Sequence, residues 1–237
     1  MTIEAAQART GFGGWTTALA AGLIGAAVGG GAVAYVSRDS VRDYLLENPE
    51  VLPEAMDRLR ERQAAKMVSA NRSALERPFR GAWAGAEQGD VVLVEFFDYA
   101  CGYCRKSNAD VERLIREDPK LKVVWREWPV LGPDSEAAAR ASLAAATAGR
   151  FKPFHDALFA AGRPTPEAVA RARSAAGIGA DLAAGVADQE LARNFDLARG
   201  LEASGTPTFV VGDQILQGAV GYQALKDAIR EAREKKG

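Results

Sequence analysis

The sequence of 237 residues is poor in histidine, in cysteine and in net charge: it has one histidine, two cysteines, and 30 basic against 31 acidic residues. Without an excess of positive charge the chain lacks the surface that binds nucleic acid, so we expect no nucleic-acid partner. Two cysteines cannot form a disulfide framework for a chain of this size. With one histidine they also leave a four-ligand zinc site incomplete, and we expect neither a resident metal nor a cofactor.

One long uncharged run is present near the N-terminus. Residues 10–37 carry no charge, and residues 15–36 are mainly apolar. A membrane-crossing helix needs about 20 apolar residues, whereas the core of a signal peptide has about 7–15. Residues 1–37 are therefore predicted to hold a transmembrane anchor. The alternative is a cleaved signal segment, because residues 32–34 read Ala-Val-Ala, a pattern that a signal peptidase can cut near Ala34.

Residues 38–77 are charged and typical of helices. An Asn-Pro pair at 48–49 divides them, because the residue before a proline disfavours the α conformation. After this break, apolar residues such as Leu52, Met56 and Leu59 form an incomplete stripe. We interpret the segment as a helical stalk, which either packs on its own domain or joins copies of the chain as a homo-oligomer.

Residues 78–237 show the alternating strand and helix patterns of an α/β domain. Short apolar runs, and a Gly-Asp pair typical of a hairpin turn, predict four strands: 91–97, 121–128, 208–211 and 214–217.

Helical patterns fill the rest of this domain. One helix is predicted after the first strand, at 102–116, and one at the end of the chain, at 222–234. Between the second and third strands, an Ala-rich stretch at about 133–200 predicts a helical insertion. Its expected helices are 134–148, 151–161, 165–175, 179–186 and 188–203.

Both cysteines lie in Cys101-Gly102-Tyr103-Cys104, between a predicted strand and a predicted helix. A C-x-x-C motif alone is weak evidence for redox chemistry, but its position between a strand and a helix makes it a redox candidate. A thiolate at Cys101 would lie at the helix N-terminus, where unpaired N–H groups and the helix dipole lower a thiol pKa. We therefore predict that Cys101 is the nucleophile and that Cys104, one turn later and more buried, closes the disulfide. The alternatives are inert buried cysteines or a site for a soft metal such as Cu(I).

A second element, Thr206-Pro207, directly precedes the strand at 208–211. Proline has no N–H donor and fits a strand entry. If the bond between these two residues is cis, the chain turns sharply and exposes the backbone of Thr206 beside Cys101. A substrate strand can then pair with it.

The segment DYACGYC after an apolar strand, followed about a hundred residues later by SGTPTFVVG, resembles the DsbA-like branch of the thioredoxin superfamily. The segments REWPVLGPDS, FHDALF and VRDYLLENPEVL match as well, so the resemblance covers residues from about 40 to 235. It implies a thioredoxin fold with a helical insertion, and thiol-disulfide exchange in the bacterial cell envelope. The separation of the two motifs agrees with this fold. A βαβ unit needs only about 30 residues or somewhat more, and the additional residues between the motifs correspond to the helical insertion.

The resemblance also implies roles for single residues. Cys101 matches the exposed nucleophile and Cys104 the resolving cysteine. Glu95 matches a buried acid behind the cysteines that shuttles the proton of Cys104. Thr206 and Pro207 match the cis-proline loop that contacts substrate.

Two features of the sequence differ from the strong oxidant of this branch. Gly102 and Tyr103 replace the Pro-His pair of the strong oxidant, and Thr206 precedes the proline. Both features look more like the disulfide isomerases and the copper-sensitivity suppressor relatives. Gly102 and Tyr103 are expected to tune the pKa of the nucleophile and the access of substrate to it.

The resemblance implies a location and partners. The catalytic domain is expected in the periplasm, anchored to the inner membrane by residues 15–36. Cysteine-containing envelope proteins are the expected substrates, and a membrane protein the expected redox partner. A redox-inert scaffold on the same fold is the remaining alternative.

Five more residues carry minor predictions. Asp98 and Tyr99, beside the cysteines, are expected to contact substrate. His155, the single histidine, is expected to be a hydrogen-bonded or half-exposed residue of the insertion without a catalytic role. Trp125 and Trp128 are expected in the core.

Overall fold

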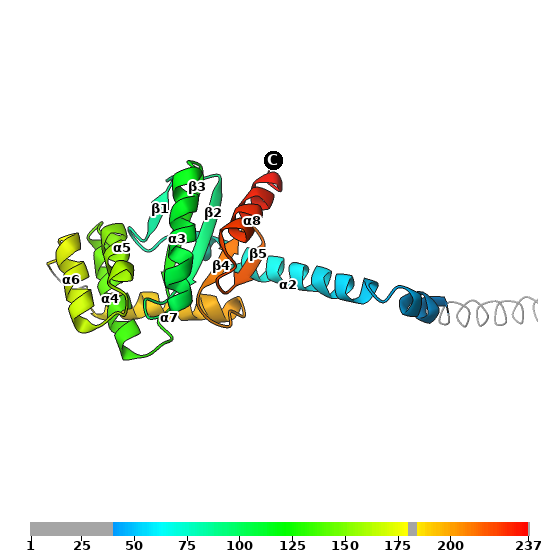
Figure 1. Ribbon diagram of the computed structural model, residues 1–237, viewed down its shortest axis with the longest axis horizontal. Helices are drawn as coiled ribbons and strands as arrows, with labels where there is room; N and C mark the ends of the chain where they lie inside the picture. The colour runs from blue at the N-terminus through cyan, green and yellow to red at the C-terminus, as the bar shows by residue number, and fades with distance from the viewer. Residues whose placement is uncertain (1–39, 180–183, 237) are drawn as a thin grey trace, which may run out of the picture. The chain divides into compact units, whose positions relative to one another are not determined.

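The structure is a computed structural model that describes residues 40–179 and 184–236 (Figure 1). These residues divide into two compact units between Arg58 and Leu59. Within the described ranges, no helix is both long and apolar enough to cross a membrane. The anchor predicted at residues 15–36 lies outside the described residues.

The first unit contains the helical residues 40–47 and the start of α2 (Val51–Glu76). The helix at 40–47 ends at the predicted Asn-Pro break, where the backbone N–H of Asn48 still donates to the carbonyl of Tyr44 at 2.8 Å. The proline at 49 then separates the two helices, because the residue before it resists the α conformation.

The second unit is built on a five-stranded sheet with the order β1-β3-β2-β4-β5. Its strands are β1 (Trp83–Gly85), β2 (Val91–Phe97), β3 (Leu121–Glu127), β4 (Thr208–Val211) and β5 (Gln214–Gln217). The central pair β2 and β3 is parallel, and the other three pairs are antiparallel. The four predicted strands are confirmed. The three-residue β1 was not predicted, because it is too short to show a periodic pattern.

Side chains alternate between the two faces of the sheet, and both faces are covered. On one face, Leu93, Phe97 and Trp125 share a core with α3 (Gly102–Glu117) and α8 (Tyr222–Glu234). On the other face, Val94 and Phe96 pack with residues of α2 and α7 (Ala184–Gly200). Figure 1 shows α3 in front of the sheet, running in nearly the same direction as β2 and β3. Burial on both faces explains why β2 is a nearly continuous apolar run rather than an alternating one.

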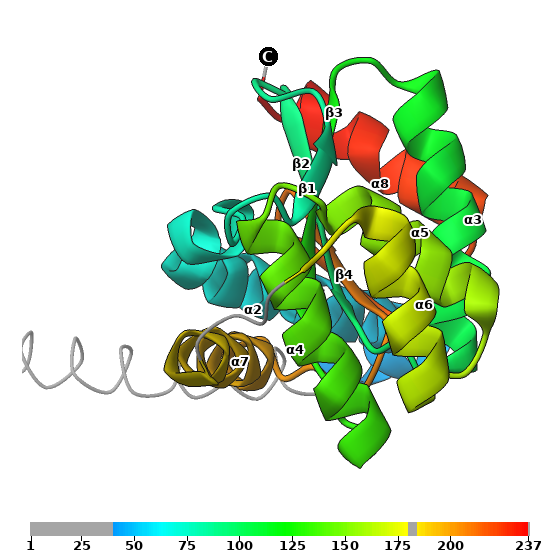
Figure 2. The ribbon, with the colours of Figure 1, turned by 90° about the vertical axis from the view of Figure 1, so that its left-hand side faces the viewer.

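The helical insertion between β3 and β4 contains α4 (Pro133–Thr147), α5 (Phe151–Ala161), α6 (Pro166–Ala176) and α7. The first three lie side by side in Figure 2 and continue the core of the α3 face.

One prediction for the insertion is wrong. Separate helices were expected at 179–186 and 188–203, but the structure has the single helix α7 from residue 184 to 200. Residues 180–183 lie outside the described residues. Ala187 and Leu191 both pack against Ala139 and Leu143 of α4. Their spacing of four residues places both on one side of a continuous helix.

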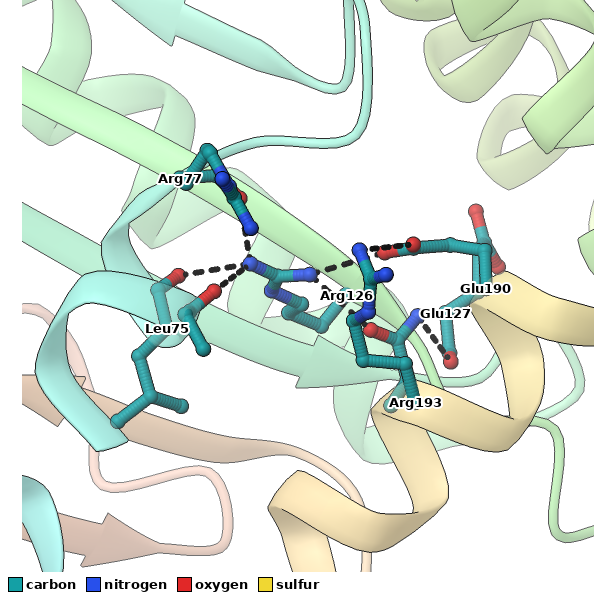
Figure 3. Close-up of polar contacts among 8 residues, drawn as sticks. Leu75, Arg77, Arg126, Glu127, Glu190 and Arg193 are labelled. Carbon is teal, nitrogen blue, oxygen red and sulfur yellow. Dashed lines mark hydrogen bonds and ion pairs between the residues drawn. The ribbon is translucent and has the colours of Figure 1, made fainter. Parts of the chain in front are cut away.

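A buried arginine connects three elements on the α7 face of the sheet (Figure 3). Arg126 of β3 donates to the carboxylate of Glu190 at 2.9 Å and to the side-chain oxygen of Asn194 at 3.2 Å, both on α7. It also donates to the carbonyls of Leu75 at 3.1 Å and of Arg77 at 2.5 Å, where α2 ends, and to that of Ala74. A cation at the end of a helix satisfies carbonyls that have no partner inside the helix. Arg126 therefore attaches the end of α2 to the sheet.

Candidate active site

Cys101 and Cys104 lie at the start of α3, directly after β2. Cys101 is the N-cap residue of α3, and its backbone N–H donates to the carbonyl of Asp98 at 3.0 Å. Both cysteines are free thiols. Cys101 is 7% exposed and Cys104 is 0% exposed, so Cys104 is the more buried of the two, as predicted.

The surroundings of the two sulfurs favour opposite protonation states. A hydrogen bond from the Cys104 thiol lowers the pKa of Cys101 to about 5, helped by the Thr206 side chain and by the backbone N–H groups of Cys104 and Tyr103. Burial raises the pKa of Cys104 far above its usual range, and its bond to Cys101 and the charge of Glu95 raise it further. Near neutral pH, Cys101 is a thiolate and Cys104 is a thiol. The thiolate is the nucleophilic form of cysteine.

Thr206 and Pro207 lie against Cys101 although 105 residues separate Thr206 from it. The bond between Thr206 and Pro207 is cis, a point that the sequence left open. As a thiol, Cys101 donates to the carbonyl of Thr206, with a sulfur-to-oxygen distance of 3.3 Å. As a thiolate, it accepts from the Thr206 side chain. Thr206 is half-buried and Pro207 is buried.

Glu95 is a buried residue of β2 on the same face as the cysteines. Its carboxylate accepts a hydrogen bond from the indole N–H of Trp125 at 3.0 Å. Burial raises the pKa of Glu95 to about 8, against this bond, and the nearby charges of Glu112 and Cys101 also raise it. Trp125 was predicted only as a core residue. Its pairing with Glu95 follows from the parallel register, in which these two residues are partners.

The prediction that Asp98 and Tyr99 contact substrate is wrong, because both side chains are buried. The carboxylate of Asp98 turns inward and accepts three backbone N–H groups, which belong to Ala100, Val130 and Leu131. These bonds are 2.7, 2.8 and 3.0 Å long and connect the segment before Cys101 to the segment after β3.

Tyr99 belongs to a buried chain of hydrogen bonds. Its hydroxyl lies 2.9 Å from the Ser142 hydroxyl and 3.1 Å from Nδ1 of His155, whose Nε2 lies 3.1 Å from the side-chain oxygen of Asn108. Burial keeps the pKa of His155 well below its usual value and that of Tyr99 well above it, so both are neutral. His155 is thus hydrogen-bonded, as predicted, and fully buried. Trp125 and Trp128 are core residues, as predicted.

The two residues between the cysteines lie at the surface. Gly102 is exposed, and the side chain of Tyr103 is 68% exposed. The structure therefore brings together Cys101, Cys104 and Thr206, with Glu95 buried behind them. In the described ranges, the cysteine site included, no group of three or more histidine, cysteine, aspartate or glutamate side chains could hold a metal ion.

Two family models match the chain. Residues 92–230 match the DSBA-like thioredoxin domain, and residues 38–66 match the N-terminal domain of the copper resistance protein ScsC.

Similar proteins of known structure agree with these matches. The chain is similar to a linker-deletion mutant of Proteus mirabilis ScsC, with 29% identity, a TM-score of 0.70, and coverage of 84% of this chain and 93% of that one. It is also similar to the thiol-disulfide exchange protein α-DsbA2 of Wolbachia pipientis, with 26% identity, a TM-score of 0.68, and coverage of 73% and 97%.

A curated relative is the Na(+)/H(+) antiporter NhaA 3 of Salinispora tropica, which is 30% identical over 163 residues. This match covers 65% of the chain and 25% of the antiporter, so the chain spans about a quarter of the length of the curated relatives it matches.

The fold is thioredoxin-like, and the family model covers more than half of the sequence, including the two cysteines and the cis-proline loop. The chain belongs to the DSBA-like thioredoxin domain family.

Proposed function

We propose that this protein exchanges disulfides with cysteine-containing proteins of the bacterial cell envelope, using Cys101 as nucleophile and Cys104 as resolving cysteine. The observation that carries the proposal is the position of Cys101 at the N-terminus of α3 with Cys104 fully buried behind it, which favours opposite protonation of the two sulfurs. Cys101 is a thiolate at a helix N-terminus, and Cys104 is a buried thiol that donates a hydrogen bond to it.

The proposed reaction has two steps. The Cys101 thiolate attacks one sulfur of a substrate disulfide, so a Cys101–substrate disulfide forms, the substrate's own disulfide breaks, and the released substrate thiolate takes up a proton. Cys104 then loses its proton and attacks Cys101. The Cys101–Cys104 disulfide forms and the second substrate sulfur leaves, so that two electrons have passed to the substrate. The reverse sequence oxidises a substrate dithiol.

Glu95 is the proposed proton carrier for Cys104. Cys104 must lose its proton in the resolving step, in a place closed to bulk water. A carboxyl with a pKa of about 8 exchanges its proton readily near neutral pH. Its charge also acts on Cys104 directly, since it contributes to the raised pKa of that thiol.

The proposed substrate contacts surround Cys101. Thr206 and Pro207 form one side, where the backbone of Thr206 can pair with a substrate strand. Gly102 and Tyr103 form the exposed side. A Cβ added to Gly102 would have no atom within 4 Å, so substrate can approach the backbone closely there.

The domain organisation remains a proposal: residues 1–37 as membrane anchor or signal segment, 38–77 as stalk, and 78–237 as catalytic domain in the periplasm. Support for the stalk comes from the match of residues 38–66 to the ScsC N-terminal domain. Leu52, Met56 and Leu59 are exposed on α2, which favours contact between copies of the chain. A membrane redox partner completes the proposal.

The reduction potential of the cysteine pair tests the proposed function and its direction. The full chain is equilibrated in glutathione buffers, and the fraction with a Cys101–Cys104 disulfide is measured by thiol alkylation. A potential of about −120 to −180 mV indicates a disulfide donor or isomerase, and one of about −270 mV a reductase. Absence of the disulfide at every glutathione ratio would overturn the proposal. The C104S variant is the matched control, because it can form only mixed disulfides.

A second candidate function is the binding of a soft metal by the same two cysteines, favoured by the match to the copper resistance protein. Thiolates suit Cu(I). Titration of the reduced chain with Cu(I) under anaerobic conditions, with C101S as control, tests it. Tight stoichiometric binding without disulfide exchange would favour this candidate over the first.

A further inference from the structure

We infer that His155 is a positioning residue for the cysteine pair. It forms hydrogen bonds with Tyr99, before the Cys101–Cys104 motif, and with Asn108, after it, and so holds the motif in its reduced arrangement. The inference rests on the proposed disulfide exchange at Cys101 and concerns how readily the reduced pair gives up its electrons.

The imidazole of His155 connects the two segments that flank the cysteines. Its Nδ1 lies 3.1 Å from the hydroxyl of Tyr99, two residues before Cys101. Its Nε2 lies 3.1 Å from the side-chain oxygen of Asn108 on α3. Asn108 follows Cys104 by four residues, so these two residues lie on the same side of α3. One side chain of α5 is thus bonded both to the segment that leads into Cys101 and to the helix that carries Cys104.

A neutral imidazole suits these two partners. The side-chain oxygen of Asn108 can only accept, so Nε2 carries the proton and Nδ1 accepts a hydrogen bond from the Tyr99 hydroxyl. The Tyr99 oxygen can then accept from the hydroxyl of Ser142, at 2.9 Å. Burial keeps the pKa of His155 well below its usual value, helped by the charge of Lys152, so the ring retains one donor and one acceptor. Both ring nitrogens therefore have a partner, as buried polar groups require.

Aromatic packing fixes the orientation of the His155 ring. The ring is fully buried. Its centroid lies 4.8 Å from the ring of Phe159, 4.9 Å from that of Trp125 and 5.1 Å from that of Phe97. A ring that is packed closely on several sides cannot turn to follow a moving partner. The two hydrogen bonds are therefore held at fixed positions.

Formation of a disulfide disturbs this arrangement. In the reduced chain the Cys104 thiol donates a hydrogen bond to Cys101, whereas a disulfide joins two sulfurs at about 2.05 Å. The sulfurs must therefore approach each other, which moves the first turn of α3 relative to the segment that precedes it. His155 is bonded to both parts and opposes this movement. It thereby stabilises the reduced form and makes the oxidised pair a stronger acceptor of electrons.

The test measures the equilibrium between the full chain and glutathione. Glutathione disulfide oxidises the reduced chain, so that the Cys101–Cys104 disulfide and two molecules of reduced glutathione form. The oxidised fraction is measured by thiol alkylation over a range of glutathione ratios. The variants are H155F, which removes both hydrogen bonds and keeps an aromatic ring, and Y99F, which removes one of them. The control is L158A, a substitution at another buried residue of α5.

We expect the equilibrium of H155F to favour the disulfide about tenfold more than that of wild type, which lowers the reduction potential by about 30 mV. The Y99F variant should shift the equilibrium in the same direction by about threefold. The L158A variant should unfold at a lower urea concentration than wild type and keep the wild-type equilibrium, because an apolar side chain forms no hydrogen bond with either side of the motif.

Two outcomes would overturn the inference. One is a wild-type equilibrium in either H155F or Y99F, and Y99F keeps the test decisive if H155F does not fold. The other is an equal shift in L158A, because the effect would then come from lost packing in α5. If wild type itself forms no disulfide at any glutathione ratio, the proposed function fails instead.

Discussion

The two faces of the central sheet both bury polar side chains, but they do so in opposite ways. On the α3 face, Glu95, Tyr99 and His155 have pKa values shifted by burial toward their neutral forms. On the α7 face, Arg126 keeps its charge although burial lowers its pKa, because it is paired with Glu190 and surrounded by carbonyl oxygens. Buried charge is thus kept where it joins elements, as at Arg126, whereas burial favours the neutral forms of Glu95, Tyr99 and His155. Beside these groups, hydrogen bonds stabilise the Cys101 thiolate.

The largest effect should come from a substitution on the α7 face, where Arg126 keeps its charge. The R126M variant leaves Glu190 without its buried partner and several carbonyls without a donor. Removal of one member of a buried ion pair costs about 3–5 kcal/mol, and we expect the free energy of unfolding to fall by that amount in urea denaturation. The double variant R126M/E190M should lose less than the sum of the two single variants. A loss below about 1 kcal/mol in R126M would contradict the role of Arg126 as a connector.

On the α3 face, the role of Glu95 can be tested by measuring how the free energy of unfolding depends on pH. Its folded pKa of about 8 lies above its ordinary value of 4.5, so the stability that its protonated form contributes is complete below pH 4.5 and is lost as the pH rises toward 8. The E95Q variant keeps an acceptor for Trp125 but has no proton to lose. Relative to E95Q, wild type should therefore lose about 2–3 kcal/mol of unfolding free energy between pH 5 and 7. Parallel pH profiles for the two proteins would show that Glu95 is ionised in the folded state.

At His155 the free energy of unfolding should change with pH in the opposite direction. Its folded pKa lies well below 6.5, so wild type loses stability as the pH falls below 6.5, because the unfolded chain binds a proton that the folded chain does not. The H155F variant loses two hydrogen bonds, and we expect it to be about 1–3 kcal/mol less stable at pH 7.5. This deficit should narrow by about 1.4 kcal/mol for each pH unit below 6.5. A deficit that is constant with pH would mean that His155 is protonated in the fold.

The smallest expected effect is at Thr206. The T206V variant removes the side-chain donor to the Cys101 thiolate and keeps the backbone carbonyl. We expect the pKa of Cys101 to rise from about 5 by about one unit, since a hydrogen bond to a charged group contributes about 1.5–3 kcal/mol at most. The measurement is thiolate absorbance at 240 nm against pH, with C101S as the control that should show no transition in this range. An unchanged midpoint would assign the low pKa to Cys104 and the backbone N–H groups alone.

Local sequence patterns were sufficient for one part of the molecule. The apolar run of β2 indicated a strand because both faces of that strand are buried, and the cysteine motif was predicted at the junction of a strand and a helix, where the structure has it. The same kind of reasoning failed at α7, where two helices were predicted although Ala187 and Leu191 lie on one continuous helix that packs against α4. It also failed at Asp98, because nothing next to that residue in sequence shows that its partners are Val130 and Leu131.

The sequence by itself thus determined most of the elements and the position of the cysteine pair, since periodicity, turn residues and helix-terminal chemistry act over a few neighbouring residues. Only the tertiary structure decided which groups surround that pair. The partner of Cys101 lies 105 residues away at Thr206, that of Glu95 lies 30 residues away at Trp125, and that of Arg126 lies 64 residues away at Glu190. Burial and hydrogen bonding set the protonation of these groups, and both depend on chain segments that meet only when the sheet and its covering helices have formed.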